Sequence, residues 1–176
     1  MRSITAAHRD IGRVYAHGGY LRPNYSGICD WALITLFQGR VGTNEVPVPT
    51  FGQNTTTHVE HSAQIKPNCS VYKVGCASEM TKGFVNGVNS VLFFERSGKE
   101  TTTREWAVLP ISRSKPFAAG GDSGSFVLDL GLALVGMIHG SVHESIYVTP
   151  IQDLANHIKE GTGCDHVRLP GGDHIN

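Results

Sequence analysis

The sequence predicts an all-β protein with one helix near its C-terminus, and three observations support this fold class. Short runs rich in Val, Ile, Phe and Tyr recur along the chain. Glycine, present 21 times in 176 residues, supplies turns between these runs. The last apolar segment, residues 149–160, instead repeats its apolar positions with helical spacing. Short strands joined by such turns are typical of a β-barrel or a β-sandwich.

The candidate strands follow one another between these turn residues. They are "IGRVYAH" (11–17), "CDWALITLF" (29–37), "SVYKVGCA" (70–77), "GFVNGVNSVLFF" (83–94), "REWAVLPI" (104–111), "GSFVLDL" (124–130), "ALVGMIHG" (133–140) and "SIYVTPI" (145–151). The polar stretch 40–68, which contains Pro47, Pro49 and a threonine run, is expected to be a connecting loop. Two cysteines inside strand-like runs, Cys29 and Cys76, are expected to be buried.

The helix is expected to begin near Thr149, which can act as N-cap, with Pro150 in its first turn. The apolar residues that share one face are Ile151, Leu154, Ala155 and Ile158. Gly161 is expected to end the helix, and the Gly- and His-rich tail after it to fray.

The bulk composition excludes several classes. The chain is 40% hydrophobic and 17% charged, with 15 basic and 15 acidic residues, so neither nucleic acid nor an anionic membrane is an expected partner. No apolar run approaches the ~20 residues that span a bilayer. The start "MRSITAAHRD" lacks the apolar core of a signal peptide. We therefore expect an intracellular protein or part of a longer polypeptide.

The stretch "AAGGDSGSFVLD" (118–129) places Ser123 in a glycine-rich turn. A nucleophilic serine needs a tight turn whose backbone N–H groups meet the developing oxyanion, and the amides of Gly121 and Ser123 are the candidates. Gly124 would leave room for substrate. The pattern is not the G-x-S-x-G elbow of α/β-hydrolases, because Ser125 stands where that motif has glycine. Taken alone, the turn is equally compatible with an ordinary glycine-rich hairpin.

Three further segments bear on the interpretation of this turn. "ALVGMIHGS" and "SIYVTPIQDLANHIK" follow it, and "CDWALITL" precedes it with Asp30 93 residues before Ser123. Together they resemble the trypsin-like (chymotrypsin-fold) serine peptidases, nearest to intracellular fungal and bacterial-type members. The stretch 71–88 also resembles those members, although Ala77, Ser78 and Glu79 replace their T-T-G.

The resemblance covers about residues 11–161 and implies a chymotrypsin-like double β-barrel with a C-terminal helix, its first barrel incomplete or reduced. It implies a remnant of the first barrel over 1–45 and an inter-barrel loop over 46–68. The second barrel with the helix would span 69–161, and a flexible tail 162–176. It also implies serine endopeptidase activity on a peptide or protein substrate, with Ser123 as nucleophile and Asp30 orienting the base.

The base itself is the open point. His8 in "ITAAH" resembles the family's base segment and precedes Asp30, but by only 22 residues. The family places several strands before its histidine, whereas seven residues precede His8. Two interpretations therefore stand: His8 is the base of a much reduced barrel, or the base lay upstream in a longer chain. In the second case the chain could be an inactive remnant with a binding or regulatory role.

The resemblance also bears on substrate recognition and on Asp122. Phe117 stands at the base of the family's specificity pocket and offers no anion for Lys or Arg. His139 and Gly140 lie on the strand that lines the substrate cleft. In secreted trypsins the aspartate before the serine pairs with a cleaved N-terminus. No I-V-G-G segment exists here, so Asp122 needs another partner, or none.

No motif predicts a cofactor or a metal. His58 and His61 are three apart, but no helical pattern or third ligand accompanies them. Rossmann and P-loop patterns are absent. A protein of another class, an unrelated β-barrel with a glycine turn, remains the third alternative.

Overall fold

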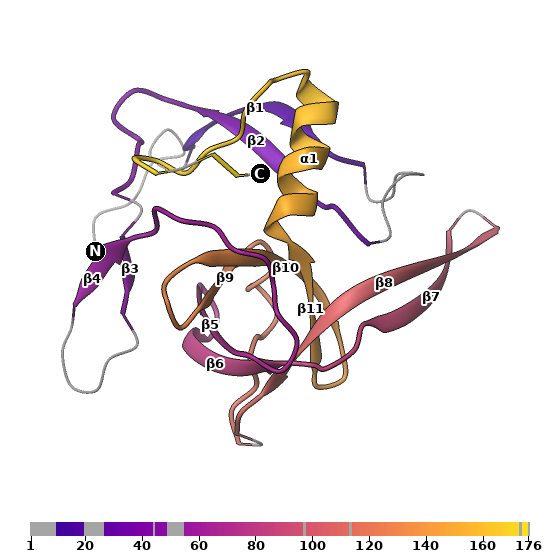
Figure 1. Cartoon of the computed structure of the whole chain (residues 1–176). Helices are drawn as coiled ribbons and strands as arrows, with labels where there is room; N and C mark the ends of the chain where they lie inside the picture. The colour runs from indigo at the N-terminus through magenta and orange to yellow at the C-terminus, as the bar shows by residue number, and fades with distance from the viewer. Residues whose placement is uncertain are drawn as a thin grey trace, which may run out of the picture.

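The structure, a computed structural model, describes residues 10–19, 27–43, 45–48, 55–96, 98–112, 114–172 and 174–175. It is built from β-strands with one helix near the C-terminus (Figure 1). The strands are β1 (Gly12–His17), β2 (Ala32–Leu36), β3 (Glu45–Pro47), β4 (Thr56–His58), β5 (Ser70–Gly75), β6 (Glu79–Val85), β7 (Ser90–Arg96), β8 (Lys99–Pro110), β9 (Phe126–Asp129), β10 (Leu134–Val142) and β11 (Ser145–Pro150). The helix is α1 (Ile151–Thr162).

The larger sheet closes into a barrel. Its strand order is β11-β10-β9-β5-β6-β8-β7, and β11 also pairs with β8, so six strands form a ring with β7 outside it. The β7–β8 hairpin therefore extends away from the barrel, as Figure 1 shows. Alternating inward residues fill the barrel because β-strands place successive side chains on opposite faces. Val71, Val85, Val108 and Val127 are all at most 2% exposed there.

A two-stranded ribbon, β1 paired antiparallel with β2, stands where the first barrel was expected. A second short pair, β3–β4, follows it. Helix α1 contacts β1 as well as β10 and β11, and Figure 1 shows it rising from the barrel beside the ribbon. The predicted fold class is confirmed, with a closed second barrel and, over the described residues, an incomplete first one.

Several local expectations were wrong. The run 83–94 is not one strand: it divides between β6 and β7 at a turn where the Gly87 amide donates to Asn86 Oδ1 at 2.9 Å. The segment 40–68 is not purely loop, since it contains β3 and β4. Cys29 is buried as expected, but Cys76 is exposed because the chain turns out of the sheet after Gly75.

Both ends of the helix also differ from expectation. Pro150 occupies the N-cap, and the hydroxyl of Thr149 is used elsewhere, on the carbonyl of Ile28. The helix continues through Gly161 and ends at Thr162, and the C-cap is Gly163, whose φ of 72° is the left-handed conformation typical of that position. The described part of the tail packs back onto the protein: Ile175 is 3% exposed, and its amide donates to the carbonyl of Val167 at 2.8 Å.

Candidate active site

A cleft of about 540 Å³ lies between the ribbon and the barrel. The ribbon side contributes His17, Gly18, Asp30, Trp31 and Ala32, and the barrel side contributes Ser123, Gly124, Phe126, Met137, Ile138 and His139. Ser123 and Asp30 are both exposed. The cleft thus brings together the predicted nucleophile and the predicted aspartate, which are 93 residues apart in the sequence.

The turn that carries Ser123 is shaped by two glycines. Gly121 has a φ of +102° and Gly124 a φ of +86°, a region that other residues rarely adopt. The Gly124 amide donates to the carbonyl of Ile138 at 2.8 Å, which fixes the turn against β10. Within the described part of the chain, the amides of Gly121 and Ser123 donate to no protein group. Ser123 lines the cleft, whereas Gly121 precedes the part of the turn that lines it.

Asp122 points the opposite way, into the barrel, and its partner is Lys73. The ammonium of Lys73 lies 2.9 Å from Asp122 Oδ2, and both side chains are fully buried. The Lys73 ammonium also donates to Ser78 Oγ at 2.5 Å and to the carbonyl of Glu79 at 3.0 Å. A glycine at position 75 is required, because a Cβ there would stand 2.3 Å from Asp122 Oδ1. The aspartate before the serine thus has an internal cationic partner.

The remaining acceptor capacity of Asp122 is also used. The hydroxyl of Ser78 donates to Oδ2 at 2.6 Å, and the amides of Ala77 and Ala119 donate at 2.8 and 3.0 Å. Burial by itself would raise the pKa of Asp122. The hydrogen bonds from Ser78, Ala119, Lys73 and Ala77 outweigh burial and hold that pKa well below its ordinary value. The carboxylate is therefore charged, and it fixes Ala119 and the turn that follows.

Asp30 lies in a short segment that is held on both sides. The preceding Ile28 donates its amide to Glu105 Oε1 at 2.9 Å and accepts a hydrogen bond from Thr149 Oγ1 at 2.6 Å. The following Trp31 donates its indole N–H to Nδ1 of His157 at 2.6 Å. The Trp31 side chain itself is buried, with 7% exposure.

His139 belongs to the cleft wall, and its ring is buried against Glu105 and Tyr147. Its Nε2 lies 3.0 Å from Glu105 Oε2, and the two side chains are 2% and 1% exposed. The ring also stacks on Tyr147, with centroids 6.2 Å apart. Nothing in the local sequence marks Glu105 as buried, because its partners lie 34 and 77 positions away in the chain.

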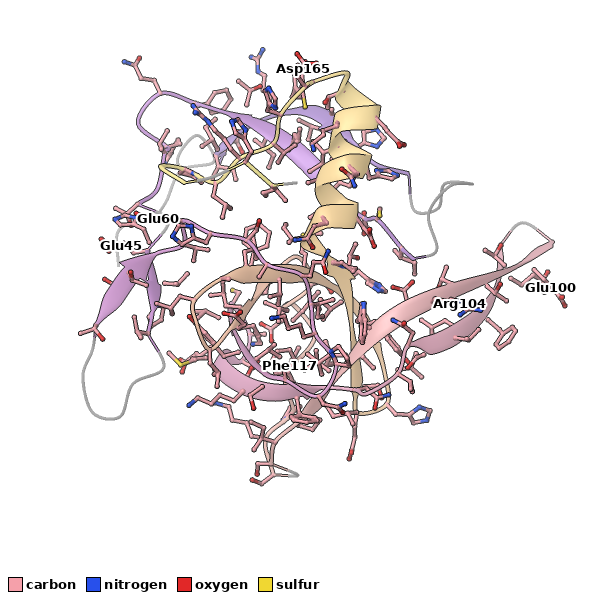
Figure 2. All side chains as sticks on the ribbon, in the orientation of Figure 1. Glu45, Glu60, Glu100, Arg104, Phe117 and Asp165 are labelled. Carbon is pink, nitrogen blue, oxygen red and sulfur yellow. The ribbon has the colours of Figure 1, made fainter. Side chains whose placement is uncertain are left out.

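The other two residues expected at a substrate pocket are not among the residues that line the cleft. Phe117 is fully buried inside the barrel, as Figure 2 shows, and its carbonyl accepts a hydrogen bond from the hydroxyl of Thr81. Gly140 is not among the residues that line the cleft.

The structure brings a histidine to the cleft that sequence reasoning did not single out. His17 ends β1 opposite Ala32 of β2, and its side chain is exposed. Strand alternation was the available signal: Asp30 and Ala32 are exposed while Trp31 between them is buried, so a residue opposite Ala32 shares their face. The predicted base, His8, lies outside the described residues.

The described residues hold no group of three or more His, Cys, Asp and Glu side chains placed to bind a metal ion. Nε2 of His58 instead lies 3.8 Å from Oε1 of Glu45, and the two exposed side chains link β4 to β3. Over the same residues, no helix has the length and apolar character needed to cross a membrane.

Comparison with known proteins agrees with the family resemblance seen in the sequence. The family model of peptidase family S64 matches residues 40–166. A solved glutamic-acid-specific serine protease is 18% identical, with a TM-score of 0.58 over 88% of this chain and 72% of that one. Cellulomonas bogoriensis chymotrypsin is also 18% identical, with a TM-score of 0.58 over 88% and 74%. Thermobifida fusca protease A is 19% identical, with a TM-score of 0.53 over 73% and 65%.

Proposed function

Because the chain belongs to peptidase family S64 and has the fold of chymotrypsin-like serine proteases, we propose that it is a serine endopeptidase acting through Ser123. The observation that carries the proposal is the turn: an exposed serine lies on the cleft that it shares with Asp30, and the amides of Gly121 and Ser123 donate to no group of the described residues.

In the proposed reaction, the Ser123 oxygen attacks the carbonyl carbon of a peptide bond and its proton passes to a histidine base. The negative oxygen of the tetrahedral intermediate accepts hydrogen bonds from the amides of Gly121 and Ser123. The base then protonates the leaving amine, which leaves an acyl ester on Ser123, and water hydrolyses that ester by the reverse roles. Asp30 orients the imidazole and stabilises its cationic form.

The base is proposed to be a histidine at the ribbon side of the cleft. His8 is the candidate from the sequence, and His17 is the candidate that lines the cleft. The substrate is proposed to lie along β10 as an extended peptide. Phe117 supplies no anion, so we expect no preference for Lys or Arg before the cleaved bond; cleavage after Arg in a peptide library would contradict this.

A fluorophosphonate probe tests the proposal, because it reacts only with an activated serine. We expect the probe to label the wild type and not Ser123→Ala. Of the two variants His8→Ala and His17→Ala, the one that removes the base should show strongly reduced labelling. A wild type that resists the probe would overturn the proposal.

The second candidate function is a catalytically inactive trypsin-fold module that binds a partner. The observation that favours it concerns the hydrogen bonding of Asp30: in the described part of the chain, no imidazole donates a hydrogen bond to its carboxylate. An unlabelled wild type that still binds an extended peptide at the cleft would support this alternative.

A further inference from the structure

Asp30 is exposed at the cleft, yet the residues next to it are among the most firmly held in the molecule. Ile28, Cys29 and Trp31 are 4%, 2% and 7% exposed. The ribbon that continues from Asp30 is a single antiparallel pair, and two isolated strands are marginally stable at best in water. The position of Asp30 therefore depends on what holds this segment to the rest of the protein.

Three buried side chains hold it, and all three come from the barrel or the helix. Glu105 of β8 accepts from the Ile28 amide, and Thr149 of β11 donates to the Ile28 carbonyl. His157 of α1 accepts from the Trp31 indole. These side chains are at most 1% exposed. A buried hydrogen bond is costly to lose because the partner is left unsatisfied, so each contact resists movement of the segment.

We propose that Glu105, Thr149 and His157 are positioning residues, together called the Asp30 clamp, which hold Asp30 at the cleft for the reaction of Ser123. Glu105 also makes a second contact, through its other carboxylate oxygen. Its Oε2 bonds to His139 on the cleft strand β10, so one carboxylate fixes both the segment that carries Asp30 and the opposite wall of the cleft.

The close approach of glycines supports this assignment. A Cβ on Gly27 would lie 3.1 Å from Glu105 Oε2. A Cβ on Gly18 would lie 2.5 Å from the Trp31 indole nitrogen. Both positions border the clamp, and both give the buried groups space that a side chain would occupy.

The chain offers a matched pair of variants for the test. Thr149→Val and Thr81→Val each remove a buried hydroxyl that donates to a backbone carbonyl, at 2.6 and 2.5 Å, and each keeps the side-chain shape. Only Thr149 contacts the segment 28–31. We expect hydrogen–deuterium exchange of that segment to rise about tenfold in Thr149→Val and to stay at the wild-type rate in Thr81→Val. Equal exchange in the two variants would overturn the clamp.

A second readout separates positioning from simple stability. The clamp rests on the proposed function, so we expect Thr149→Val to lower the maximal rate of fluorophosphonate labelling at Ser123 about tenfold with little change in the concentration of probe for half-maximal rate. Faster exchange with an unchanged labelling rate would refute a role in the reaction. Should the wild type resist the probe, the proposed function fails, while the exchange comparison still decides whether the clamp holds the segment.

Glu105→Gln provides the conservative variant. The amide oxygen can still accept from the Ile28 amide, so exchange of the segment should remain within about twofold of wild type. Glu105→Val loses that acceptor and should exchange at least as fast as Thr149→Val. Rapid exchange in Glu105→Gln as well would contradict the assignment of the Ile28 contact.

Discussion

Replacing Lys73 by methionine tests how the turn that carries Ser123 is held. The variant keeps the length of the side chain but removes the ammonium that lies 2.9 Å from Asp122, so the buried carboxylate loses its cation. Removing one member of a buried ion pair costs about 3–5 kcal/mol. The hydrogen bonds from Ser78, Ala77 and Ala119 remain, so we expect about 3 kcal/mol, near the lower end of that range.

The assay is urea unfolding at pH 7, followed by tryptophan fluorescence. A loss of about 3 kcal/mol corresponds to a melting temperature lower by roughly 6–12 °C for a domain of this size. The control is a double-mutant cycle with Asp122→Asn: the double variant should cost less than the sum of the single ones, because neither group is then left without its partner. Additive costs, or a loss below about 1 kcal/mol for Lys73→Met, would refute the reasoning.

Two more predictions concern the same turn. The pKa of Asp122 is lowered on folding, so its carboxylate contributes stability that is fully present above the ordinary aspartate pKa of about 3.9 and is lost as the pH falls below it. The difference in urea midpoint between wild type and Asp122→Asn should therefore narrow below about pH 4; a difference that widens in acid would be inconsistent with this. Gly121→Ala should lose about 1–3 kcal/mol and slow labelling of Ser123, because its φ of +102° strains any residue with a Cβ. Gly120→Ala is the control, since a Cβ there meets nothing within 4 Å, and equal behaviour of the two variants would exclude strain as the cause.

Much of the fold was predictable because its signals are local. Alternating apolar residues and glycine turns are properties of neighbouring positions, and they located β5, β9, β10 and β11. The run 83–94 was misread because apolar character on both sides of Asn86 and Gly87 masked the turn between them. Thr149 was misassigned as the N-cap because a hydroxyl before a helix can equally serve a distant carbonyl.

The site was predictable only in part, for a related reason. The turn that carries Ser123 was predictable because its serine and glycines are neighbours in the sequence. The buried ion pair beside this turn has no such local signal. Lys73 and Asp122 are 49 positions apart, and each is of a residue type usually found at the surface. His17 reaches the cleft through the pairing of β1 with β2, which depends on strand register.

The pairing of Asp122 with Lys73 has a consequence for what the turn depends on. The cation belongs to β5, so the folded barrel itself contains the positive charge beside this aspartate. No newly formed chain end is needed to supply that charge. Because Asp122 also accepts from the Ala119 amide, the shape of the Ser123 turn is tied to the integrity of the barrel.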